Sequence, residues 1–103
     1  MSKRRVVVTG MGALTPVGIG LETSWNAMVA GQSGVGMITS FDASGLACSI
    51  AAEVPEFDPE HYLSQKEAKK MDRFMVLGIA AGIEAFRDSG LEVTELNAPR
   101  MGA

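Results

Sequence analysis

The sequence predicts an α/β fold, in which buried strands alternate with covering helices. Three observations carry this prediction. The β-branched run Val6–Val8 is typical of a strand buried on both faces. Leu21–Ala30 and the longer stretch Ser64–Ser89 show helical patterns, and a second strand is expected between them over Ser49–Val54. The resulting order, strand-helix-strand-helix, is that of an α/β protein.

Composition excludes several classes of protein. Of the 103 residues, 47% are hydrophobic and 20% charged, and the net charge is −3. This mild acidity argues against bulk attraction to nucleic acid or anionic lipid. No run approaches the about 18 consecutive apolar residues of a membrane span. We expect no secretory signal, because only Val6–Val8 follow the basic start before glycine. The single cysteine, Cys48, excludes an internal disulfide. We therefore expect a cytoplasmic protein that binds neither nucleic acid nor membrane.

The segment that follows the first strand, VVVTGMGALTPVG, is too glycine-rich to predict a regular element. Gly10 and Gly12 are spaced as in a dinucleotide-binding turn, but Thr15 stands where that fingerprint has glycine or alanine. The acidic residue expected about 20 positions further on has no counterpart at that spacing. The sequence therefore disfavours a bound cofactor, although a nicotinamide-binding α/β protein stays an alternative of a different class.

The first helix is expected over Leu21–Ala30, with Gly31 placed to end it. Gln32–Gly45 is expected to be mostly loop, and Pro55 stops the second strand. One apolar stripe, expected to face the core, recurs along the helix at Leu21, Trp25, Met28 and Val29.

The second helix has clear start signals. Asp58 precedes a proline, which predicts a short capped turn. Ser64 and Glu67 then form a capping box, after which one helix is expected to run to Ser89.

Small residues mark one face of this second helix, and they imply close contact with another helix or a sheet. Each glycine in a helix interior costs about 1 kcal/mol relative to alanine, so tight packing must compensate. Too little of this sequence is left to cover that face, so we expect residues 1–103 to be the N-terminal portion of a larger α/β protein. The small residues are Gly78, Ala81, Gly82 and Ala85.

Four cations recur at i, i+3, i+4 and i+7 and would span about 100° of one helix face. Such a stripe can attract an acidic partner. Alternatively, it is a solvated face balanced by Glu67 and Asp72, or the binding surface of a free-standing interaction module. The four are Lys66, Lys69, Lys70 and Arg73.

Several ordered segments together resemble the start of a β-ketoacyl-acyl-carrier-protein synthase of the elongating, synthase II type. They are RRVVVTGMGALTPVG, AGQSGV, FD, KEAKKMDRF and DSGL. The resemblance implies the N-terminal part of a thiolase-like α-β-α-β-α layered fold, in which the glycine loop is structural. It also implies a homodimeric, cytoplasmic acyltransferase of fatty-acid elongation. That enzyme condenses an acyl thioester with malonyl-carrier protein by decarboxylation, without metal or other cofactor.

The resemblance also assigns a partner. In this family the basic residues of KEAKK help to dock the acidic acyl carrier protein, and here they are Lys66, Lys69 and Lys70. Arg73 extends the set by geometry alone. Members of the family often have arginine within this segment, where this chain has lysines and the neutral Gln65, so we expect any bidentate contact with carboxylate or phosphate to be weaker.

The same resemblance implies a Cys-His-His catalytic set beyond residue 103. Cys48 and His61 match no nucleophile motif, so neither is assigned a catalytic or metal-binding role, and this fragment alone is expected to be inactive. A polyketide ketosynthase, or a chain-length partner that lacks the nucleophile, would share this N-terminal pattern and stays an alternative.

Overall fold

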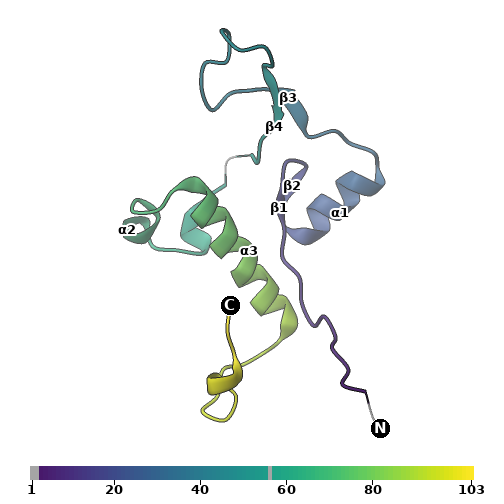
Figure 1. Cartoon of the computed structure of the whole chain (residues 1–103), viewed down its shortest axis with the longest axis vertical. Coiled ribbons are helices and arrows are strands. Elements are labelled where there is room, and N and C mark those ends of the chain that lie inside the picture. The colour runs from purple at the N-terminus through teal and green to yellow at the C-terminus, as the bar shows by residue number, and fades with distance from the viewer. Residues whose placement is uncertain (1–2, 56) are drawn as a thin grey trace.

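The computed structural model of the chain describes residues 3–55 and 57–103. Its elements lie around one long helix, α3 (Arg73–Ser89), with a short 3₁₀ turn, η2 (Ala98–Arg100), after it (Figure 1). The Cα radius of gyration is 17.6 Å, against about 13 Å for a compact domain of this length. The described part is therefore open rather than closely packed. None of its helices is both long enough and apolar enough to cross a bilayer.

The glycine-rich loop contains a short antiparallel pair that the sequence did not predict. Strand β1 (Leu14–Thr15) pairs with β2 (Gly18–Ile19). The Thr15 hydroxyl oxygen accepts a hydrogen bond from the Val17 amide at 3.3 Å, which stabilises the tight connection between the two strands. The prediction of no regular element here was wrong, because a two-residue connection needs little more than this side-chain bond to close.

The predicted first strand is not formed. Val6–Val8 has no strand partner among the described residues, and Val6 is 90% exposed. A strand is stabilised by ladder bonds to a neighbouring strand. Because β1 and β2 pair with each other, the apolar run is left as an elongated exposed trace (Figure 1).

Helix α1 (Leu21–Val29) forms as predicted and ends at Gly31, where the amides of Gly31 and Gln32 bond back to the carbonyls of Met28 and Ala27. Its orientation differs from the prediction. The Ser24 hydroxyl donates to the Gly18 carbonyl at 3.0 Å, which turns that side of the helix onto the β1–β2 pair. The apolar stripe consequently lies exposed at Trp25, Met28 and Val29.

A second antiparallel pair follows. Strand β4 (Ile50–Ala52) confirms the strand predicted over Ser49–Val54, with shorter bounds. Its partner β3 (Val35–Met37) lies inside the predicted loop, in a register that sets Gly36 opposite Ala51. Glycines on both sides of Val35 hid this strand from the sequence pattern.

The prediction of a single helix over Ser64–Ser89 was wrong. This stretch of chain forms two helices, α2 (Gln65–Ala68) and α3. Asp72 has φ −67° and ψ 155°, an extended conformation that a continuous helix cannot contain. The Asp72 carbonyl instead accepts the first bond of α3, from the Met75 amide at 3.0 Å. Asp72 occupies the N-cap position of α3, although its side chain makes no capping hydrogen bond there.

Two glycines let the N-terminal stretch pass directly against the α3 backbone. A Cβ on Gly12 would overlap the Ala81 carbonyl oxygen and lie 2.7 Å from the Ala85 amide nitrogen. A Cβ on Gly10 would overlap the Ala85 carbonyl and lie 2.7 Å from the Ser89 Cα. Real Cβ atoms do not approach other atoms this closely, so only glycine fits at these two positions.

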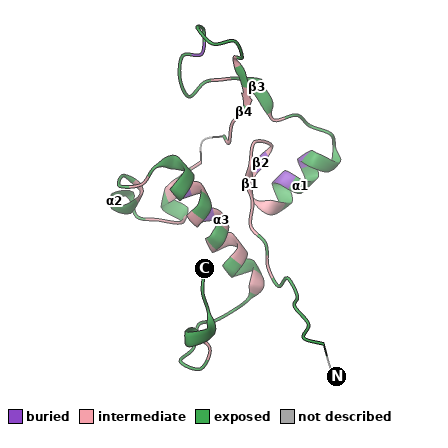
Figure 2. Ribbon diagram, in the orientation of Figure 1, coloured by how far each residue is buried: buried purple, intermediate pink, exposed green. Residues whose placement is uncertain are grey.

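The small-residue face of α3 is therefore used only in part. Ala81 and Ala85 lie under the N-terminal stretch, and Ala80 is fully buried. Gly78 and Gly82, however, have no neighbour in the described part of the chain within 4 Å of where a Cβ would stand. The prediction that these two glycines contact another element is not met within the described residues. Figure 2 shows how much of the helix surface remains exposed.

We expect Gly12→Ala to lower the free energy of unfolding of the full-length protein by about 2 kcal/mol, because the new methyl group must displace backbone of α3. Thermal melting of the purified variant measures the effect. Gly45→Ala is the matched control, since Gly45 has no close neighbour among the described residues and no positive φ. Equal melting temperatures for the two variants would contradict the close approach.

Candidate functional site

The candidate site is the lysine segment, which we define as residues 57–72. It contains the 3₁₀ turn η1 (Pro59–His61) and α2. The Asp58 carboxylate caps η1 by accepting the Glu60 amide at 2.9 Å. The predicted capping box is confirmed at α2, where the side chains of Ser64 and Glu67 each accept from the other's backbone amide. Local hydrogen bonds thus fold this segment.

The three lysines stay together. Lys66, Lys69 and Lys70 are exposed and lie on the helical turn formed by α2 and the residues just after it. The Lys69 and Lys70 amides bond to the carbonyls of Gln65 and Glu67, so the spacing i, i+3 and i+4 still places the three on one face.

Arg73 is separated from these lysines by the helix break. It begins α3, so the predicted stripe of four cations on one helix was wrong. Its guanidinium Nη2 donates to the Val54 carbonyl at 2.8 Å and to the Pro55 carbonyl at 3.3 Å. These bonds join the start of α3 to the chain just before the lysine segment. Whether Arg73 also contacts a partner stays a prediction.

A second polar contact joins the segment to α3. The Tyr62 hydroxyl donates to a Glu84 carboxylate oxygen at 2.6 Å across 22 positions of sequence. This bond raises the pKa of Tyr62, and partial burial and the negative charge of Glu84 act in the same direction. The Phe57 ring meets the Tyr62 ring edge to face, with centroids 6.1 Å apart. Tyr62 is therefore held from two sides.

The chain just after β4, to which Arg73 is hydrogen-bonded, is itself held in place by Glu53. The Glu53 carboxylate accepts bonds from the Thr39 amide at 2.8 Å and the Ser40 amide at 3.0 Å. It also accepts from both hydroxyl groups of these residues. The Ser40 hydroxyl and the Thr39 amide are the main causes that lower the pKa of Glu53 from 4.5 to about 2.

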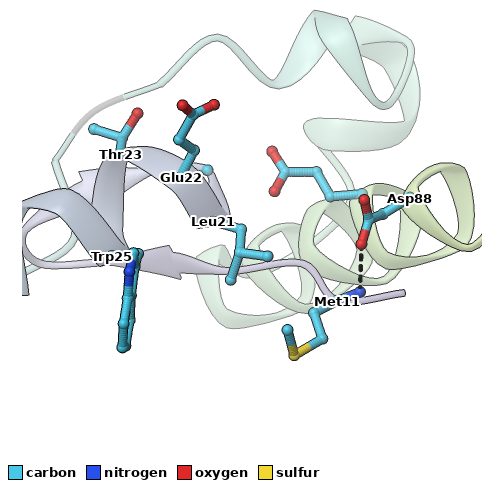
Figure 3. A pocket seen from close by; sticks show the side chains of 8 residues that line it. Met11, Leu21, Glu22, Thr23, Trp25 and Asp88 are labelled. Atoms are coloured by element: carbon cyan, nitrogen blue, oxygen red, sulfur yellow. Dashed lines mark hydrogen bonds between the residues drawn. The ribbon is translucent and has the colours of Figure 1, made fainter. Parts of the chain in front are cut away.

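The glycine pair serves close packing and not phosphate binding. A hollow of about 700 Å³ lies beside it at the start of α1, with Glu22 on α1 and Asp88 on α3 around it (Figure 3). The Met11 amide already donates to the Asp88 carboxylate at 3.0 Å. Carboxylates at a helix N-terminus repel a phosphate there. This geometry disfavours the nicotinamide-binding alternative.

The two other reactive side chains, those of Cys48 and His61, take no part in the contacts described above. Cys48 is exposed, and its thiol donates weakly to the Ile50 carbonyl at 3.5 Å. His61 is exposed within η1. In the described residues, no three His, Cys, Asp or Glu side chains come together as a metal site would require.

The sequence pattern did not predict the two polar contacts that hold the lysine segment, which we call tethers: those of Arg73 and Tyr62. Asp72 was the available sign that a new helix starts at Arg73. The partners of Tyr62 and Arg73 lie about 20 residues away along the chain. No periodic pattern identifies contacts at that separation.

Comparison with known proteins points to one family. The family model described as Beta-ketoacyl synthase, N-terminal domain, matches residues 3–103. The 3-oxoacyl-[acyl-carrier-protein] synthase 2 of Vibrio cholerae is 58% identical over 99% of this chain. The synthase 2 proteins of Synechocystis and Staphylococcus aureus (strain COL) are 46% and 39% identical over 99% and 96% of it. This chain covers 25%, 24% and 24% of these three relatives, about a quarter of their length.

A solved structure agrees with this grouping. The ishigamide ketosynthase/chain length factor is similar with a TM-score of 0.80 and 36% sequence identity, over 88% of this chain and 23% of that one. The similarity at this level of identity extends to the fold as well as the sequence.

We expect Glu53→Gln to speed amide exchange at Thr39 and Ser40 at neutral pH, measured by hydrogen exchange on the full-length protein. Because the pKa of Glu53 is lowered, its contribution to stability is complete above about 4.5 and is lost as the pH falls toward about 2. The two proteins should therefore converge near pH 2. Glu95→Gln, at an exposed carboxylate, is the control. A Glu53 carboxyl that titrates near 4.5 in carbon NMR would contradict the assignment.

Proposed function

This chain belongs to the β-ketoacyl synthase family and matches its N-terminal domain, and on that premise we propose that the whole protein is a 3-oxoacyl-[acyl-carrier-protein] synthase of fatty-acid elongation. Its fold is the N-terminal part of the thiolase-like α/β fold. The observation that carries the proposal is the 58% identity to a synthase 2 across 99% of the chain.

The reaction we propose is a decarboxylative condensation. A cysteine thiolate takes the acyl group from its carrier thioester and releases the carrier thiol. Malonyl-carrier protein then loses CO2, and the resulting enolate attacks the acyl carbon, which breaks the bond to the cysteine sulfur, frees the thiolate and lengthens the chain by two carbons. The thiolate and two histidines are expected from outside residues 1–103. The part described here contributes scaffold and a docking surface.

That docking surface consists of Lys66, Lys69 and Lys70, which we propose contact the acidic acyl carrier protein. Three exposed cations on one helical turn suit an acidic partner, because opposite charge raises the encounter rate. Each lysine offers a flexible point charge rather than the planar fork of arginine. We therefore expect binding here to depend on salt more than on bidentate geometry.

We also propose that the rest of the protein covers the exposed apolar faces. Phe74 is 68% exposed beside Gly78, and Trp25 is 62% exposed on α1. Apolar surface of this extent is costly in water. The relatives are about four times as long as this chain, and a protein of that length has enough further residues to bury this apolar surface. The whole enzyme is further proposed to be a cytoplasmic homodimer.

A second candidate is a polyketide ketosynthase or a chain-length partner without the nucleophile. The similarity to the ishigamide ketosynthase/chain length factor favours it, at 36% identity. The sequence of the full-length protein discriminates among these, because a chain-length partner would lack the catalytic cysteine.

The function is tested with the full-length protein, an acyl-carrier protein and malonyl-carrier protein labelled in its free carboxyl group. We expect release of labelled CO2 and a 3-oxoacyl product two carbons longer, without added nicotinamide nucleotide. No CO2 release from an enzyme that holds the catalytic cysteine would overturn the proposed function.

We expect Lys66→Glu combined with Lys70→Glu to weaken binding of the carrier protein to the full-length enzyme by roughly tenfold or more at low salt, because two attractions become repulsions. The melting temperature should stay unchanged, since both side chains are exposed. Titration calorimetry at two salt concentrations measures the affinity. Lys3→Glu with Arg4→Glu, an equal charge reversal elsewhere on the exposed surface, is the control. Unchanged affinity in the first variant removes the docking hypothesis.

A further inference from the structure

The lysine segment meets the start of α3 at a hollow of about 310 Å³, which is lined by Phe57, Ala68, Met71 and Val76 among others. Helix α2 has only four residues, too few to be stable without outside support. The position of the lysines therefore depends on polar contacts that join the segment to its surroundings.

Arg73 makes one of these contacts at the base of the segment. Its hydrogen bonds to the carbonyls of Val54 and Pro55, which lie 19 and 18 positions before it, hold the two ends of the segment together. The chain leaves β4 and returns as α3 at this point. A guanidinium is well suited to the task, because it is always charged and presents several N–H donors in a rigid plane.

Tyr62 makes the other contact, near the middle of the segment. Its hydroxyl donates a hydrogen bond to the Glu84 carboxylate, which lies three helical turns along α3 from Arg73. Bonds at the base and in the middle fix the segment at two separated points. Two such points restrict rotation as well as translation of the lysine-bearing turn.

We propose that Arg73 and Tyr62 are positioning residues that hold the lysine segment in the orientation its acidic partner recognises, and that Arg73 is not itself a docking cation. This inference rests on the proposed function. A docking surface that is already ordered avoids the entropy cost of ordering it on binding. The tethers thus act on the affinity for the partner and not on the chemical step.

The test uses the full-length enzyme with Arg73→Met and Tyr62→Phe, each assayed with malonyl-carrier protein and with malonyl-pantetheine. We expect the KM for malonyl-carrier protein to rise roughly fivefold in each variant, as for loss of one ordinary hydrogen bond. The kcat with malonyl-carrier protein and both constants with malonyl-pantetheine should not change. Tyr62→Phe removes no positive charge, so its effect should persist at high salt.

Two further variants separate positioning from charge. Arg73→Lys keeps the charge and a donor and should recover part of the lost affinity, whereas Arg100→Met removes an exposed arginine elsewhere and should behave as wild type. The proposal is overturned if Tyr62→Phe has the wild-type KM and the raised KM of Arg73→Met returns to the wild-type value at high salt. Arg73 would then contact the partner directly. Loss of kcat on both substrates would show a general structural role and overturn the proposal.

Failure of the proposed function itself is distinguishable. In that case the wild-type enzyme does not use malonyl-carrier protein at all. Hydrogen exchange over residues 57–72 then still tests the tethers, because both variants should exchange faster than wild type there and normally elsewhere. Unchanged exchange over the segment would overturn the positioning role without reference to any substrate.

Discussion

The contact on which the rest of this structure depends is the passage of the N-terminal stretch against α3. At Gly10 and Gly12 the backbone lies so close to Ala81 and Ala85 that no side chain fits between them. This contact brings β1 against α3, and Ser24 in turn fixes α1 on the β1–β2 pair. Steric exclusion at two glycines thus determines where β1, β2 and α1 lie relative to α3.

The lysine segment obeys a different constraint. Local caps determine its shape, and long-range polar bonds join it to its surroundings. Hydrogen bonds are directional, and two of them at separate points define an orientation that loose apolar packing would not. The docking surface proposed above would benefit from that definition. The division between a sterically fixed scaffold and a segment positioned by polar bonds follows from these two kinds of contact.

The elements set by local chemistry were predictable. Gly31 ends α1 and the Ser64–Glu67 box starts α2, because capping depends on residues within one turn of each other. The break at Asp72 was not, since the helical pattern of the sequence runs through it and no capping side-chain bond marks the extended backbone there. The strand at Val6–Val8 failed for another reason. Its β-branched run favours extended backbone, but a strand forms only where a neighbour offers ladder bonds.

The sequence by itself determined the family, the C-terminal end of α1, the capped start of α2, the close grouping of Lys66, Lys69 and Lys70, and the absence of a complete dinucleotide fingerprint. All of these depend on residue identity over short spans. Only the tertiary structure decided that the glycine pair admits α3, that Arg73 belongs to a tether, and that Tyr62 meets Glu84. Those contacts join residues about 20 or 70 positions apart. Their existence depends on how the whole chain folds back on itself, which no local pattern records.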